Sequence, residues 1–295
     1  MITEGIIGHE LLVRLFVTWS TQPANGYLFH GASHLGKRMV AERFVSSLLG
    51  TPAEKINRAH PDLILLEPEE GKMIIASKAV REARLRCSSR PMVAPRQVVY
   101  LPFADRLNAE GANALLKVLE EPPAQAVFVL VAEDVSRLPE TVHSRLVAVP
   151  FHSVPETVIV EHLVSRGIDR ADAEQRAKMS CGRPGLAIEI EEGGMWSTDF
   201  PERFLRATSF GERIAIIDEM TGACEQMDDP QSAWLDCLDV WIQRLRLSLK
   251  EADSKSGRAL LHTAHGVCGA RRSVGTSLSP RLALEQSAVQ LDMLK

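Results

Sequence analysis

The sequence predicts an α/β fold in which a parallel β-sheet domain is followed by helical regions. Three observations predict it. Short apolar runs alternate with helical stretches in the first half, a glycine-rich phosphate loop follows the first run, and the pattern becomes helical from Pro155 onward. Nearly continuous apolar runs are typical of strands that are covered on both faces by helices, as in parallel sheets.

The first predicted strand leads directly into a phosphate-binding loop. Gly26–His30 is a short apolar run, and the loop Gly31–Lys37 has the form G-x-x-x-x-G-K. Apolar residues then recur at helical spacing from Met39 to Leu49, and Gly50 ends the helix. Such loops need a strand before them and a helix after them, so we interpret this one as a descendant of a nucleotide-binding loop.

The loop lacks the residue that would bind a metal. In working loops the backbone amides and the lysine hold the phosphates, while a Ser or Thr after the lysine binds Mg²⁺. Arg38 has that position, and a guanidinium can bind a phosphate but cannot ligate a cation. Two interpretations of Gly31, Gly36, Lys37 and Arg38 remain open. Either the loop still holds an anion at the helix N-terminus, or it is a relic whose glycines fit the turn.

Four further apolar runs complete the predicted sheet, and helical patterns follow. The runs are Leu63–Leu66, Val98–Leu101, Val127–Val131 and Val147–Val149. Helices are expected at Asn113–Glu120, which two prolines end, and at Val158–Ser165, Arg170–Ser180, Glu202–Ala207, Glu212–Ala223 and Ala233–Glu251.

These patterns indicate three domains. We expect residues 1–152 to form the sheet domain with the phosphate loop, residues 153–194 a small helical domain, and residues 195–295 a C-terminal helical domain. The second boundary falls near Glu191–Gly194, where two glycines interrupt the helical pattern.

Composition excludes several classes of protein. The five cysteines form no C-x-x-C pair, so neither a zinc site nor a disulfide framework is indicated. The first residues do not resemble a signal peptide, and no apolar run reaches the roughly 18 residues of a membrane span, so we expect a soluble cytoplasmic protein with no membrane partner. The net charge of -4 argues against nonspecific nucleic-acid binding by the whole surface, so any DNA contact would be local.

Several motifs occur in the order in which one known family carries them. The most specific is Asn113–Pro123, with the sequence NALLKVLEEPP. The others are His60–Asp62 before an apolar strand, Leu138–Leu146 (LPETVHSRL), Gly182–Gly185 (GRPG) and Ser279–Glu285 (SPRLALE). Together they closely resemble the clamp-loader subunits of bacterial DNA polymerase III, the gamma/tau and delta-prime branch of the AAA+ ATPases. The resemblance implies an AAA+ domain, a helical lid domain and a C-terminal domain that joins a collar shared with other subunits.

The departures from the family pattern indicate that the ATPase site has been lost. Where hydrolysing relatives have a strand-ending Asp-Glu that holds Mg²⁺ and polarises water, this chain has Pro102 and Phe103. The next acid, Asp105, is expected to serve structure. The sensor-2 arginine position falls on Gly185 or Leu186, the sensor-1 polar position falls near Ala132 or Glu133, and the link 49–57 has no cysteine where many relatives carry a zinc module. The resemblance therefore implies no metal, no cofactor and no intrinsic ATPase activity.

The pair Ser144–Arg145 is retained from the family pattern. The resemblance implies that this arginine acts in trans, as an arginine finger on the γ-phosphate of ATP held by a neighbouring subunit of the ring. A guanidinium suits this role because it can bind phosphate through several N–H donors. The alternative, from the residues alone, is a surface salt bridge after a turn.

Arginines form a basic cluster within Val80–Arg96. Its members are Arg81, Arg84, Arg86, Arg90 and Arg96. The cluster is either a solvated face whose arginines pair with nearby acids such as Glu82, or a phosphate contact to primed DNA threaded inside the ring. In the second case, binding would fall as salt rises.

The resemblance and its departures together indicate a non-hydrolysing subunit of the delta-prime type, part of a DNA polymerase complex. It would complete the AAA+ ring with gamma/tau and delta subunits, donate Arg145 to a neighbour's ATP, and help to load the sliding clamp on primed DNA. One alternative is an interaction protein of the AAA+ fold outside the clamp loader. Another is an ATPase with unorthodox metal ligands, against which Arg38, Pro102 and Phe103 argue.

Overall fold

The chain folds into two compact units, Met1–Val158 and Ile159–Lys295, in the computed structural model of the protein. The structure describes residues 6–51, 58–69, 74–123, 125–190, 200–227, 230–251, 254–274 and 279–293. The predicted boundary at Glu191–Gly194 and residues 52–57 of the cysteine-free link lie outside these ranges.

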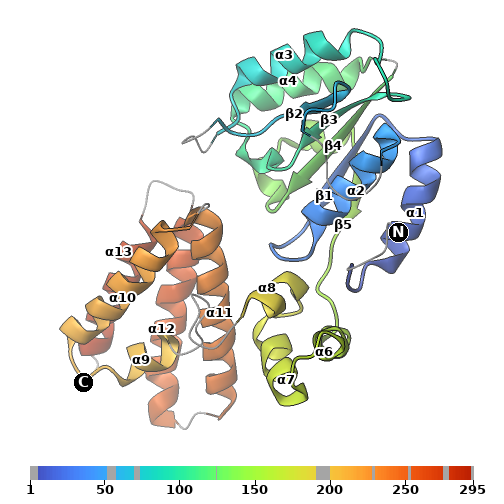
Figure 1. Cartoon of the computed structure of the whole chain (residues 1–295). Helices are drawn as coiled ribbons and strands as arrows, with labels where there is room; N and C mark the ends of the chain where they lie inside the picture. The colour runs from blue at the N-terminus through green and yellow to red at the C-terminus, as the bar shows by residue number, and fades with distance from the viewer. Residues whose placement is uncertain are drawn as a thin grey trace. The chain divides into compact units, whose positions relative to one another are not determined.

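The first unit is built on a five-stranded parallel sheet, as the apolar runs predict. The strands are β1 (Gly26–His30), β2 (Leu63–Leu65), β3 (Gln97–Leu101), β4 (Ala126–Ala132) and β5 (Val147–Pro150), in the spatial order β2-β3-β4-β1-β5 (Figure 1). Every neighbouring pair is parallel. All five strands therefore begin at one edge of the sheet and end at the other.

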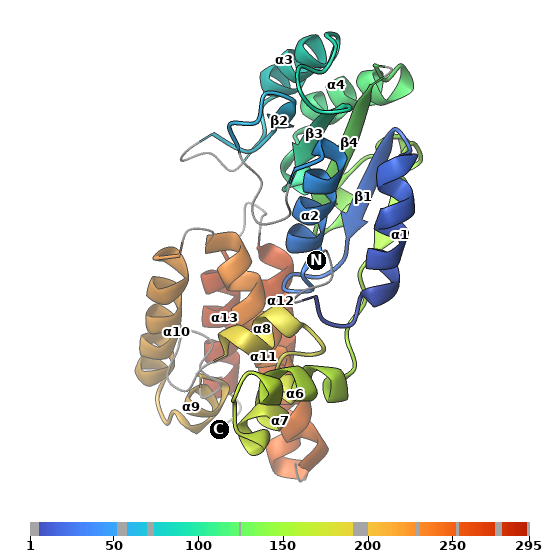
Figure 2. The ribbon, with the colours of Figure 1, turned by 45° about the vertical axis from the view of Figure 1, so that its right-hand side comes forward.

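Helices cover both faces of the sheet and create two apolar cores. α1 (Glu10–Thr21) and α2 (Lys37–Leu49) cover one face of the sheet (Figures 1 and 2). The aromatic side chains of Phe16, Tyr27 and Phe44 are buried together there. α3 (Ser77–Cys87) and α4 (Ala109–Glu120) cover the other face. Successive strand residues such as Leu28 and Phe29 belong to opposite cores, which explains why the runs are apolar at nearly every position.

Short elements occupy the two edges of the sheet. η1 (Ala104–Arg106) follows β3, and η2 (Val135–Arg137) and α5 (Glu140–His143) lie between β4 and β5. Asn108 caps α4 by accepting a hydrogen bond from the Gly111 amide (2.7 Å). Because α4 runs from the end of β3 back towards the start of β4, its last residue, Glu120, lies at the edge where the strands begin.

The second unit is helical in the part that the structure describes. α6 (Glu156–Ser165) begins just before this unit, and the helices that follow are α7 (Arg170–Met179), α8 (Pro184–Glu189), α9 (Phe200–Arg206), α10 (Phe210–Glu225), α11 (Pro230–Glu251), α12 (Ser254–Ser273) and α13 (Pro280–Met293). Its core is centred on Trp241, which is fully buried and packs against Phe204 with ring centroids 5.5 Å apart. Among the described residues no helix has both the length and the apolar composition needed to cross a membrane.

The helices expected from the sequence are all present, with small shifts at their ends, whereas α1, α3, α5, α8, α12 and α13 were not predicted. The first predicted boundary, after residue 152, lies close to the division at Val158. The second boundary, between the lid and the C-terminal domain, falls outside the described residues, so the three-domain division stays a prediction.

Candidate functional site

The phosphate loop has the backbone geometry that its glycines predict. It joins β1 to α2, and Gly31 and Gly36 have positive φ angles of 144° and 82°. A Cβ on Gly31 would lie 2.5 Å from the carbonyl oxygen of Phe151, so a larger residue does not fit there. The loop therefore has the glycine conformations that the predicted phosphate-loop turn requires.

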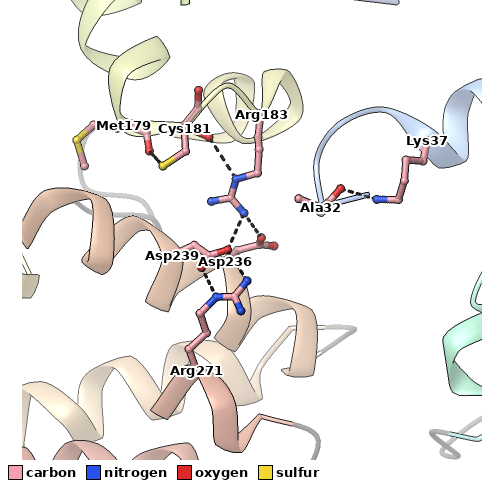
Figure 3. Close-up of polar contacts among 9 residues, drawn as sticks. Ala32, Lys37, Met179, Cys181, Arg183, Asp236, Asp239 and Arg271 are labelled. Atoms are coloured by element: carbon pink, nitrogen blue, oxygen red, sulfur yellow. Dashed lines mark hydrogen bonds and ion pairs between the residues drawn. The ribbon is translucent and has the colours of Figure 1, made fainter. Parts of the chain in front are cut away.

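Lys37 is engaged within the loop itself. Its side chain is buried, and Nζ donates a hydrogen bond to the carbonyl oxygen of Ala32 at 2.5 Å (Figure 3). A phosphate-binding lysine would direct this charge at the ligand. In this structure the carbonyl oxygen of Ala32 accepts one of the hydrogen bonds that the Lys37 ammonium group can donate.

Arg38 contacts Phe103, one of the two positions where the resemblance predicts the loss of a metal-binding acid. Its guanidinium carbon lies 5.1 Å from the ring centroid of Phe103, and its Nε donates to Glu42 Oε1 at 3.2 Å. Arg106 also lies over the Phe103 ring, at 4.5 Å from the centroid. Two positions that the resemblance assigns to lost metal ligands are thus brought together, and they carry a guanidinium and a phenyl ring joined by a cation–π contact. The sequence identified both substitutions and missed their contact.

The donor chemistry around the loop does not fit a divalent cation. Neither a guanidinium nor a phenyl ring offers a lone pair to a hard cation, which needs oxygen ligands. In the described ranges no group of three His, Cys, Asp or Glu side chains is placed to hold a metal ion. His30, at the end of β1, has a pKa below its ordinary value because of burial and the neighbouring His143, His152 and Lys37, so it is neutral at pH 7 and adds no charge to the loop.

Asp105 holds two loops together, as expected for a structural acid. Its Oδ2 accepts hydrogen bonds from the backbone amides of Glu133 (3.1 Å) and Asp134 (3.3 Å), which follow β4. Pro102 and Phe103 separate it from the end of β3. The carboxylate therefore fixes the turn after β4 with the lone pairs that a metal would need.

Ser144 and Arg145 lie between α5 and β5, close to the end of α4. Arg145 Nη2 donates to Glu120 Oε1 at 2.8 Å, and Nη1 donates to the carbonyl oxygen of Thr141 at 2.8 Å. The Ser144 hydroxyl donates to the same carbonyl at 3.1 Å. The arginine side chain is 35% exposed. A surface salt bridge is therefore present, and part of the Arg145 side chain remains exposed to solvent.

Sheet topology separates Arg145 from the chain's own phosphate loop. The loop follows β1 and lies at the edge where strands end, whereas Arg145 precedes β5 and pairs with Glu120 at the edge where strands begin. Four residues of extended strand span roughly 13 Å. A phosphate held in the chain's own loop would therefore lie out of reach of Arg145.

The basic cluster lies on α3 and the loop after it. Arg81 forms an ion pair with Glu110 of α4, while Glu82 pairs with Lys78 (3.8 Å), not with an arginine of the cluster. Arg84, Arg86 and Arg90 are exposed, and none of them forms an ion pair with another residue that the structure describes. Arg96 donates to the Thr21 carbonyl oxygen (3.5 Å). Three arginines of the cluster are therefore available to an anionic partner.

In the second unit, the turn at the sensor-2 position sends an arginine into the helical core. Arg183 is buried, and its Nη1 donates to Asp236 Oδ1 (3.1 Å) and to Asp239 Oδ2 (3.2 Å) of α11 (Figure 3). Arg271 of α12 also pairs with Asp239, and this hydrogen bond raises the pKa of its guanidinium. No local sequence pattern indicates this network, because its members are far apart in the chain. It ties α8 to α11 and α12.

Comparisons with known proteins agree with these observations. Residues 18–155 match the family described as "DNA polymerase III, delta subunit". The chain is 36% identical to DNA polymerase III subunit delta' of Escherichia coli (strain K12) over 138 residues, which are 46% of this chain and 41% of that protein. It is 24% identical to DNA polymerase III subunit tau of Bacillus subtilis (strain 168) over 242 residues, 76% of this chain and 41% of that protein.

One solved structure resembles the chain over nearly its whole length. It is a DNA polymerase III gamma subunit-related protein from Thermotoga maritima, with a TM-score of 0.54 and 19% identity, covering 96% of this chain and 98% of that chain. The chain spans less than half of the length of either curated relative. The predicted α/β fold with a helical C-terminal region and the resemblance to subunits of bacterial DNA polymerase III are thereby confirmed.

Proposed function

We propose that the chain, which matches the family described as "DNA polymerase III, delta subunit" over residues 18–155, is a delta-prime type subunit of the replicative clamp loader. It would complete the AAA+ ring without hydrolysing ATP, and it would act on ATP held by its neighbour. Helping to open the sliding clamp onto primed DNA would be the role of the whole complex, in the cytoplasm.

The contact between Arg38 and Phe103 is the observation that carries the non-hydrolysing role. ATP hydrolysis at such loops needs a metal ion to neutralise the charge on the transferring phosphoryl group. A positive side chain stacked on an apolar ring repels a cation and offers it no ligand. Lys37, which is bonded to the Ala32 carbonyl, supports the same conclusion.

The exposed guanidinium of Arg145 supports a finger in trans. Its place at the edge opposite the phosphate loop prevents it from reaching that loop, and its partial exposure leaves it accessible to a neighbouring subunit. A finger supplied in trans increases turnover by roughly 10³- to 10⁵-fold in single-site GTPases. In a ring with other ATP sites, one finger accounts for a smaller share of the total turnover. We therefore expect its loss to slow turnover about tenfold.

Gamma/tau and delta subunits are the proposed partners, together with the sliding clamp and primed DNA. The tau subunit of Bacillus subtilis and the gamma-related protein of Thermotoga maritima resemble this chain over most of its length, as expected for subunits of one ring. Arg84, Arg86 and Arg90 supply positive charge that other described residues do not neutralise. Contacts of these arginines with DNA phosphates would weaken as salt rises.

The test is ATP turnover by the complex reconstituted with gamma/tau and delta subunits. We expect Arg145→Ala to slow turnover about tenfold and to leave assembly intact. Arg137→Ala is the matched control, because Arg137 is similarly exposed and pairs with Asp134 at 3.6 Å, and it should leave turnover unchanged. Normal turnover with Arg145→Ala would refute the finger.

Two further measurements address the alternatives. The isolated chain should show no hydrolysis of Mg-ATP, and measurable hydrolysis would favour an ATPase with unorthodox ligands. The chain should also copurify with gamma/tau and delta subunits. If it binds neither of them, it is an interaction protein of the AAA+ fold outside the clamp loader.

A further inference from the structure

We propose that Glu120 is a positioning residue for Arg145, which holds the guanidinium in the orientation that a neighbour's phosphate requires. This inference rests on the proposed function, since it assigns a role to the partner of the proposed finger. It starts from the ion pair between Arg145 Nη2 and Glu120 Oε1.

Two separate elements hold the guanidinium. Glu120 is the last residue of α4, and the Thr141 carbonyl belongs to α5. Both bonds are 2.8 Å long, and they involve different nitrogens of the group. Because a guanidinium is planar and rigid, two bonds to two nitrogens fix the plane of the whole group.

The anchors leave most donors free for a ligand. A guanidinium has five N–H donors, and the two bonds to Glu120 and Thr141 use two of them. The Arg145 side chain makes no other hydrogen bond or ion pair within the described part of the chain. The three remaining N–H groups belong to a side chain that is 35% exposed, so a phosphate can approach without breaking either anchor.

Stability of the fold does not account for this ion pair. Glu120 is 46% exposed and Arg145 is 35% exposed, and ion pairs between such side chains contribute little to folding. An arginine on a surface is otherwise free to adopt many rotamers, and ordering it at the moment of reaction lowers the rate. Glu120 would avoid this lowering of the rate by ordering the Arg145 side chain before the reaction. Its contribution should therefore affect kcat of the complex more than KM for ATP.

Glu121 provides a matched control. It is the neighbouring acid, it is exposed, and no bond joins it to Arg145 within the described residues. Substitution of either acid removes one negative charge from the same short segment. A difference between the two variants therefore reports the contact with Arg145 and not the general electrostatic field.

The experiment compares steady-state ATP turnover by complexes that contain the full-length variants. We expect Glu120→Ala to lower kcat about threefold with an unchanged KM for ATP. Glu120→Gln keeps an oxygen that accepts the same N–H bond, so it should retain most of the rate. Glu121→Ala should behave as the unsubstituted chain, and Glu120→Ala should have no further effect when combined with Arg145→Ala.

Each result distinguishes this inference from the proposed function. If Arg145→Ala slows turnover but Glu120→Ala does not, the finger stands and the positioning role of Glu120 is overturned. A faster rate with Glu120→Ala also overturns it, because the carboxylate would then compete with the phosphate. If Arg145→Ala itself has no effect, both the finger and the role of Glu120 fail. An unchanged melting temperature and unchanged assembly of the Glu120→Ala complex verify that the rate reports the contact.

Discussion

Asp62 shapes the loop before β3, and its replacement by asparagine should destabilise the first unit. The side chain is fully buried. Oδ1 accepts a hydrogen bond from the Met92 amide (2.6 Å), and Oδ2 accepts from the amides of Val93 (2.8 Å) and Ala94 (2.7 Å). The Asp62 amide donates to His60 Nδ1 (3.2 Å), so the His60–Asp62 motif orders itself as well as the loop.

The pKa of Asp62 shows that the carboxylate is stabilised in its charged form. Burial by itself raises the pKa, but the three amides and His60 outweigh burial, and the pKa lies below its ordinary value. In Asp62→Asn, one oxygen becomes an NH₂ group that faces at least one amide donor. A hydrogen bond to a charged group contributes about 1.5–3 kcal/mol, and a buried unsatisfied donor costs about 1–3 kcal/mol. We therefore expect a loss of about 2–4 kcal/mol.

Urea unfolding at pH 7 measures this loss, and hydrogen exchange at the amides of residues 92–94 localises it. Asp105→Asn is the control, because Asp105 accepts from two amides at longer distances of 3.1 and 3.3 Å and is only half-buried. It should cost about 1 kcal/mol or less. Equal losses for the two variants, or a loss below about 1 kcal/mol for Asp62→Asn, would refute the reasoning.

The same carboxylate predicts a pH dependence. A lowered pKa in the folded state means that the stabilisation is present above the ordinary pKa of 3.8 and is lost as the pH falls through the lowered value. The difference in unfolding free energy between the unsubstituted chain and Asp62→Asn should therefore shrink below about pH 4. A difference that stays constant down to pH 2 would contradict the assignment of the charged form.

Two further predictions concern buried groups. Arg183→Ala leaves Asp236 as a buried carboxylate that has lost its ion-pair partner, so we expect a loss of about 3–5 kcal/mol in urea unfolding, and Arg183→Met with Asp236→Leu should recover much of it. Burial raises the pKa of the Cys87 thiol to about 11, so this thiol should resist alkylation at pH 8 in the folded chain and react after unfolding. Because the pKa is raised on folding, the associated stability is present below the ordinary pKa of 9.0 and is lost as the pH rises towards about 11.

The strands were predictable because both faces of the sheet are covered. Each strand places neighbours such as Leu28 and Phe29 in different cores, and this requirement leaves a continuous apolar run in the sequence. The loop turn was predictable for a similar reason, since Gly31 occupies a position where any Cβ would collide with Phe151. Such constraints restrict the residue type at one position or along one short run, so they can be recognised in a short stretch of sequence.

The missed features depend on contacts between distant segments. Phe103 meets Arg38 only because β1 and β3 lie on either side of β4 and end at the same edge, an order that the sequence does not reveal. Asp62 and its amide donors are likewise separated by a whole helix. The sequence of α3 indicates only a cluster of basic residues and no helix. Few residues of α3 are buried, so the apolar pattern that would indicate a helix is weak.

The parallel sheet also explains why the proposed finger at Arg145 does not depend on the phosphate loop. Residues that contact the loop lie at the edge where strands end, and Arg145 with Glu120 lies at the edge where they begin. The separation, roughly 13 Å of strand, exceeds the ~7–10 Å within which substitutions usually affect one another. Substitutions at Arg38 and Phe103 should therefore leave the guanidinium of Arg145 undisturbed. The proposed loss of hydrolysis and the proposed finger are structurally independent, since the two sites share a scaffold and no side chain.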